Sequence, residues 1–138
     1  MLDIQIKEEP LSVDECYQLV QDGAAGGTSL FVGTVRDATK GRTVVRLDFE
    51  AYTPMAISEM QKIATTAVER WQVQKMCIHH RIGSLTVGEI AVIIAVATPH
   101  RKAAFETCQY AIDTLKETVP IWKKEIFGDG EVWVSAHP

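Results

Sequence analysis

Three short segments of this 138-residue chain carry positive charges that core packing does not explain. The clearest is Thr98-Pro99-His100-Arg101, which predicts Thr98 as the N-cap and Pro99 as the first residue of a helix. His100 and Arg101 would then lie in the first turn, where the helix dipole already presents positive potential. A phosphate-like anion held between them would explain the two charges. The alternative is that both side chains face solvent, or that Arg101 pairs with a carboxylate elsewhere.

A second group of cations surrounds the expected end of the same helix. Lys116 lies in the last turn, where a solvated lysine would simply complement the dipole. The segment that follows alternates as a strand, so Lys123 and Lys124 point to opposite faces and only one can share a pocket with Lys116. Glu125 shares a face with Lys123 and could orient it. Clustered cations lower the pKa of a lysine, which makes it a usable base or nucleophile near neutral pH.

The third segment is Phe31–Asp37. Gly33 inside an expected strand indicates a bulge or a close backbone approach, which would let a ligand reach the strand while Arg36 closes its end. The alternative is a hairpin strand that ends in a surface pair of Arg36 with Asp37.

Other familiar chemistries find little support. His79 and His80 are adjacent on an expected strand and face opposite sides, so they cannot form one metal site. Cys16, Cys77 and Cys108 are odd in number, widely spaced and without a CxxC pair, which predicts reduced, mostly buried thiols rather than a disulfide frame or a zinc site. No nucleophile elbow and no paired carboxylates stand out. We therefore expect a cation-lined site for an anionic substrate, with no metal and no organic cofactor.

The composition narrows the class of protein further. A net charge of -4 disfavours a nucleic-acid binder, and 46% hydrophobic residues argue against disorder. The longest apolar run, Ile90–Ala97, is far shorter than a membrane span, and the N-terminal segment has no signal core. We expect a cytoplasmic protein with a single catalytic domain over residues 1–138.

Apolar periodicity predicts the elements that must position these residues. We expect an α+β fold with three helices and a mainly antiparallel, mixed sheet. Its third helix should bury a stripe made of Phe105, Cys108, Ile112, Leu115 and Val119. The expected order is a strand at Ile4–Ile6, a helix capped by Ser12, a hairpin of Thr28–Val35 with Val44–Tyr52, a helix over Thr53–Trp71, strands Val73–Ile82 and Glu89–Thr98 joined by a connection at Gly83–Gly88, a helix over Pro99–Val119, and strands Ile121–Phe127 and Glu131–Val134.

At these residues the sequence resembles the MoaE family, the large catalytic subunit of molybdopterin synthase. The matching segments are collinear and cover nearly the whole chain. They are FVGTVRD at 31–37, LDFEAY at 47–52 with Met55-Ala56, HRIG at 80–83 with Gly88-Glu89, His100-Arg101 with AFE at 104–106, DTLK at 113–116, PIWKKE at 120–125 and Trp133-Val134.

This resemblance implies a fold, a reaction and partners. The fold would be α/β-hammerhead-like, with a homodimeric core that binds a small ubiquitin-like sulfur carrier of the MoaD type at each end, a heterotetramer. The carrier's C-terminal glycine thiocarboxylate would supply two sulfur atoms to cyclic pyranopterin monophosphate (precursor Z), forming the dithiolene of molybdopterin. This chain ends Ser135-Ala-His-Pro138 without Gly-Gly, so the carrier is expected to be a separate protein.

The resemblance also implies residue roles. Lys116 and Lys123 match the catalytic lysines of the family. The positions that match its substrate contacts are Thr34, Val35, Arg36, His100, Arg101, Lys124 and Glu125, together with the two lysines. The family's longer tail contributes a basic residue, for which His137 is the candidate in this chain.

Helix geometry adds an expectation about assembly. Fifteen steps separate Arg101 from Lys116, about 22 Å along one helix, which is longer than a tricyclic pterin. A two-fold dimer would bring Arg36, His100 and Arg101 of one subunit beside Lys116 and Lys123 of the other.

Two other functions remain open at this point. A non-enzymatic α+β module that binds a phosphate-bearing small molecule is the main alternative. An RNA-binding module is disfavoured by the acidic balance and by the lack of an aromatic strand platform.

Overall fold

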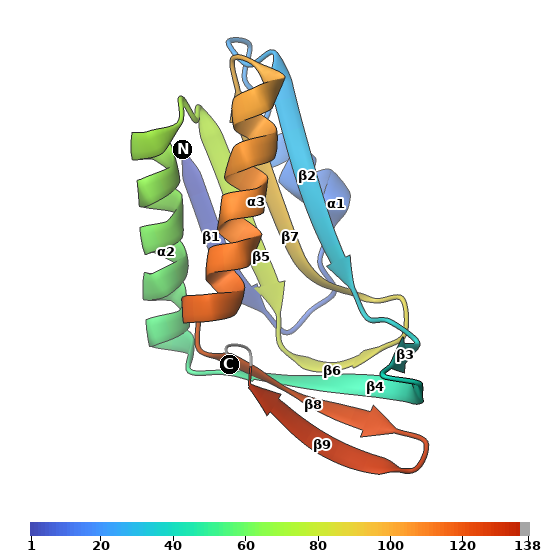
Figure 1. Cartoon of the computed structure of the whole chain (residues 1–138). Helices are drawn as coiled ribbons and strands as arrows, with labels where there is room; N and C mark the ends of the chain where they lie inside the picture. Colours follow the sequence, from blue (N-terminus) through green and yellow to red (C-terminus); the bar gives the residue numbers. More distant parts are fainter. Residues whose placement is uncertain (136–138) are drawn as a thin grey trace.

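The computed structural model describes the backbone of residues 1–135 and the side chains of residues 1–131. Two sheets and three helices make up this part of the chain, which confirms the α+β class (Figure 1). The elements in order are β1 (Leu2–Lys7), α1 (Val13–Leu19), β2 (Gly27–Thr34), β3 (Ala38–Thr39), β4 (Arg42–Ala51), α2 (Thr53–Arg70), β5 (Lys75–Arg81), β6 (Gly83–Thr86), β7 (Ile90–Thr98), α3 (Arg101–Thr118), β8 (Ile121–Phe127) and β9 (Gly130–Ser135).

The first sheet has the strand order β1-β5-β7-β2, and only the β1–β5 pair is parallel. Helices α2 and α3 cover one face of it and α1 covers the other (Figure 1). The central strand β7 is therefore buried on both sides, as its uninterrupted apolar run predicts.

The second sheet consists of β3, β4, β8 and β9, with β6 also paired to β4, and it lies across the C-terminal end of α3 (Figure 1). Two sequence predictions were wrong here. Thr28–Val35 does not form a hairpin with Val44–Tyr52, because β2 pairs with β7 in the first sheet and β4 pairs with β3, β6 and β8. The segment expected to be a plain connection, Gly83–Gly88, contains β6.

Local turn chemistry explains the different hairpin. Lys40 and Gly41 both have positive φ, the geometry of a two-residue turn that joins β3 tightly to β4. The turn makes β3 the hairpin partner of β4, and β2 pairs with β7 instead. Residues between Thr34 and Ala38 carry the chain from one sheet to the other.

Helix α3 packs on β2 and β7 through small residues. Its buried positions are Ala104, Thr107, Cys108, Ala111 and Leu115. The expected stripe was wrong at Phe105, which is 63% exposed, because the close approach of the helix to the sheet selects the small side chains one position away. None of the helices in the described residues is long and apolar enough to cross a bilayer.

Candidate active site

A pocket of about 220 Å³ lies where the two sheets and the end of α3 meet. Strands β2, β4 and β7 supply a largely apolar wall, and the polar groups come from α3, β8, β2 and β5. The residues that line it are Phe31, Gly33, Thr34, Leu47, Phe49, His80, Ala91, Val92, Leu115, Lys116, Ile121 and Lys123.

Lys116 and Lys123 reach this pocket from two consecutive elements. Lys116 lies in the last turn of α3, and Leu115 beside it is buried and anchors the turn. The helix ends before Pro120, and β8 starts at Ile121, so that Lys123 comes back to the same side. Chain reversal at Pro120 thus places two ammonium groups in one pocket, as the sequence predicts.

The electrostatic surroundings of Lys116 lower its pKa. Protein atoms around the ammonium group remove part of its hydration, and the positive charges of Lys123 and Arg36 disfavour protonation further. The side chain still keeps contact with solvent. Lys116 therefore gives up its proton more readily than an ordinary surface lysine.

His80 is a pocket residue whose role the sequence analysis did not identify. Its Nδ1 donates a hydrogen bond to the carbonyl oxygen of Arg81 at 2.8 Å, which leaves Nε2 as an acceptor. Burial lowers the pKa of His80 to about 4, and the charge of Lys116 acts in the same direction. The ring stacks edge-on against Phe49, with centroids 5.5 Å apart. The pocket thus contains a neutral imidazole beside the lysines.

Gly33 and Thr34, at the end of β2, form another side of the pocket. The β2–β7 register shifts between Gly33 and Thr34, which confirms the expected irregularity. A Cβ atom at Gly33 would lie 2.7 Å from Cγ1 of Val92, so the close approach requires glycine. Val35 is buried, and both its backbone groups are bonded, its N–H to Glu89 and its carbonyl to the N–H of Gly88. Val35 therefore supports the segment, whereas Thr34 faces the pocket.

Lys124 and Glu125 occupy different faces of β8. Lys124 forms an ion pair with Glu131 at 3.1 Å, on the opposite face from Lys123. Glu125 is buried on the same face as Lys123 and lies opposite Leu47 of β4. The structure therefore separates Lys124 from the pocket within one chain.

His100 and Arg101 lie at the other end of α3. His100, not Thr98, is the N-cap, because Thr98 still belongs to β7 and its hydroxyl donates to the His100 carbonyl at 2.6 Å. Arg101 starts the helix, packed so closely on Gly27 that a Cβ there would lie 2.9 Å from its backbone. Both side chains are exposed. The rise of α3 places them about 22 Å from Lys116.

Within one chain, the pocket cations Lys116 and Lys123 are thus separate from His100 and Arg101 at the start of α3. Arg36 belongs with Lys116, whose pKa it lowers, and this corrects the expected grouping of Arg36 with Arg101. His137 lies outside the described residues.

Comparison with known proteins identifies the family. The model of the MoaE protein family matches residues 6–118, most of the chain. The chain belongs to the MoaE family. A Bacillus subtilis member, a molybdopterin synthase catalytic subunit, is 46% identical over 130 residues, which cover 94% of this chain and 83% of that protein.

Solved structures of MoaE-like proteins share the fold. A molybdopterin synthase structure from Staphylococcus aureus superimposes with a TM-score of 0.90 at 42% identity, covering 94% of both chains. A protein–protein complex of subunits 1 and 2 of molybdopterin-converting factor from Helicobacter pylori contains a chain with a TM-score of 0.75 at 23% identity, covering 96% of this chain and 89% of its own. The second likeness shows the fold alone.

Proposed function

We propose that this MoaE-family chain is the catalytic subunit of a molybdopterin synthase. It transfers sulfur from the C-terminal thiocarboxylate of a small ubiquitin-like carrier to cyclic pyranopterin monophosphate, building the dithiolene of molybdopterin. The observation that carries the proposal is the pocket in which Lys116, with a lowered pKa, lies close to Lys123 and Arg36. Membership of the MoaE family indicates which substrate class this pocket binds, a pterin phosphate.

The pocket suits two anionic reactants. A cyclic phosphate and a thiocarboxylate both carry negative charge, which the cations concentrate and which they stabilise as it develops during transfer. Lys116 can give or take a proton as the carrier's carboxylate leaves, because its lowered pKa brings the amine closer to neutral pH. The neutral His80 supplies a hydrogen-bond acceptor that does not add to the positive charge.

A complete site requires two copies of the chain in this proposal. Lys116 and Lys123 act from one subunit, and His100 and Arg101 of its neighbour hold the phosphate. The separation of about 22 Å along α3 supports this, since one pterin cannot touch both ends of the helix. An isologous dimer can place the first turn of one α3 beside the last turn of the other.

The edge of the first sheet offers the carrier a path to the lysines. Strand β2 is at the edge of its sheet, where its outer side pairs with no strand of the described residues, and Phe31, Gly33 and Thr34 of β2 line the pocket. An extended carrier tail added to this edge would deliver its C-terminal glycine into the pocket. With one carrier on each subunit, the assembly is a heterotetramer. The cytoplasmic location and the single catalytic domain stay predictions.

Reconstitution tests the proposed reaction. The chain is mixed with thiocarboxylated carrier and cyclic pyranopterin monophosphate, and the sulfur-containing product is measured by mass spectrometry. Formation of the dithiolene, lost in Lys116→Ala, supports the transferase. Tight binding of the pterin phosphate with no product, despite active carrier, would favour the non-enzymatic phosphate-binding module instead.

A further inference from the structure

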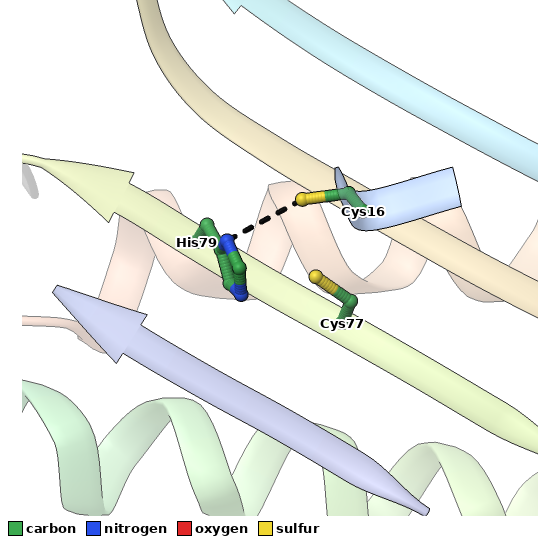
Figure 2. Close-up of side chains that lie close together, drawn as sticks. All are labelled: Cys16, Cys77 and His79. Atoms are coloured by element: carbon green, nitrogen blue, oxygen red, sulfur yellow. Dashed lines mark hydrogen bonds between the residues drawn. The ribbon is translucent and has the colours of Figure 1, made fainter. Parts of the chain in front are cut away.

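Two thiols and one imidazole form a cluster on the face of the first sheet opposite the pocket. Cys16 comes from α1, whereas Cys77 and His79 are alternate residues of β5, and the three side chains meet between helix and sheet (Figure 2). Their donor atoms, two sulfurs and one ring nitrogen, lie within 4.8 Å of one another. All three residues are fully shielded from solvent. The proposed sulfur transfer makes no use of them.

Asp3 of β1 sets the tautomer of His79. One of its carboxylate oxygens lies 2.7 Å from Nε2 of His79, and a carboxylate accepts hydrogen bonds, so Nε2 carries the proton. The lone pair of Nδ1 then faces Cys16, whose Sγ is 3.4 Å away (Figure 2). Metal-binding histidines show this arrangement, with one ring nitrogen donating to a carboxylate and the other bound to the metal.

The spacing of the donor atoms matches a tetrahedral ion. Zinc bonds of about 2.3 Å to sulfur and about 2.0 Å to nitrogen place the two donors about 3.5 Å apart at the tetrahedral angle. The observed separation of 3.4 Å between Cys16 and His79 is close to this value. A simple thiol–imidazole hydrogen bond would use one thiol, whereas here Cys77 adds a second sulfur at the same place.

A fourth ligand is available beside Cys16 on α1. Oε2 of Glu15 lies 3.9 Å from Nδ1 of His79 and is paired with Lys7 at 3.0 Å. To complete the site, this carboxylate would have to turn from Lys7 toward the two sulfurs. Lys7 remains near enough to offset part of the negative charge that two thiolates and a carboxylate bring.

We propose that Cys16, Cys77 and His79 bind a divalent cation of the zinc class, with the carboxylate of Glu15 as fourth ligand. When the ion binds, both thiols release their protons to solvent and bind as thiolates. No group is oxidised or reduced. Four protein ligands, of which Cys16, Cys77 and His79 are fully buried, are typical of a closed structural site. The ion would join α1 to β5 and stabilise the folded chain. Separation of the ligands along the sequence hides this site from motif analysis.

Cobalt titration under reducing conditions tests the site, because tetrahedral Co²⁺ with thiolate ligands absorbs characteristically. We expect the full chain to take up one Co²⁺ with thiolate-to-metal charge-transfer absorption, and Zn²⁺ to displace it and raise the Tm. Cys16→Ser and Cys77→Ser should lose the charge-transfer intensity and the Tm increase. Cys108→Ser is the matched control, since Cys108 is also buried and free but belongs to α3, where its thiol donates to the Ser29 carbonyl, and it should behave as wild type.

A measurement on the wild-type chain alone protects the test against variants that fail to fold. X-ray absorption of the zinc-loaded protein should show two sulfur neighbours at about 2.3 Å and two nitrogen or oxygen neighbours at about 2.0 Å. Absence of stoichiometric uptake by reduced wild-type chain would overturn the proposal. A zinc ion without sulfur neighbours would also overturn it. The same holds if the folded Cys16→Ser and Cys77→Ser variants give the same cobalt spectrum as wild type.

Discussion

The composite active site makes the most demanding prediction. Arg101→Ala removes the proposed phosphate-binding group at one end of α3, and Lys116→Ala removes the proposed catalytic amine at the other. Each homodimer should be nearly inactive. A mixed dimer, however, contains one site with both groups intact, formed by Arg101 of one subunit and Lys116 of the other, and one site that lacks both.

The expected recovery follows from the geometry and from random assortment. The fifteen residue steps along α3 span about 22 Å, so the two groups cannot serve the same pterin from one chain. After free exchange of equal amounts, about half of the dimers are mixed, and half of the sites in these dimers are intact. Activity should therefore return to about a quarter of the wild-type value.

The assay is product formation with thiocarboxylated carrier before and after subunit exchange, with exchange verified by native mass spectrometry. Mixing Lys116→Ala with Lys123→Ala is the matched control, because both residues line the same pocket of one chain and every site stays defective. No recovery in the first mixture despite proven exchange, or equal recovery in both, would refute the composite site.

Three further predictions test individual groups. Lys116→Met should nearly abolish turnover without lowering the free energy of unfolding at neutral pH, because it removes a cation that burial, Lys123 and Arg36 disfavour. Any gain in the stability of Lys116→Met over wild type should shrink as the pH rises from the lowered pKa of folded Lys116 toward 10.5, the pKa in the unfolded chain, because the wild-type amine then becomes neutral. Urea titrations at several pH values measure this difference. A marked loss of stability in the variant at pH 7 would contradict the prediction. Gly33→Ala should destabilise the fold by about 1–3 kcal/mol and narrow the pocket, because the new Cβ meets Val92 at 2.7 Å, and an unchanged Tm with full activity would argue against this contact. Deletion of the last two glycines of the carrier should abolish sulfur transfer while the two proteins still co-purify; transfer at the normal rate would show that the tail does not enter the pocket.

Much of the candidate site follows from the sequence alone, because periodicity within one element is local. Two-residue alternation separates Lys123 from Lys124 and His79 from His80, and the structure places each pair on opposite faces. The end of α3 at Pro120 and the return of β8 bring Lys116 and Lys123 together, as predicted. Matching motifs along the whole chain also indicate the family, which the comparisons confirm.

Contacts between distant segments could not be predicted in this way. Alternation shows which side chains share a face, but it does not show which strand lies alongside or what covers that face. The tight turn at Lys40-Gly41 gives β4 its partner β3, and β2 pairs with β7 instead. Periodicity also does not show how closely a helix approaches the sheet. In α3 the buried side chains are mostly small, and Phe105 is exposed.

The sequence by itself therefore determined the helices and most of the strands, the faces of the charged residues and the family. Only the tertiary structure decided that Arg36 stands beside Lys116, that His80 enters the same pocket, and that Cys16 meets Cys77 and His79. The physical reason is that dihedral preferences and side-chain periodicity act over a few residues. The approach of α1 to β5, or of one sheet to the other, depends instead on how the whole chain buries its apolar surface.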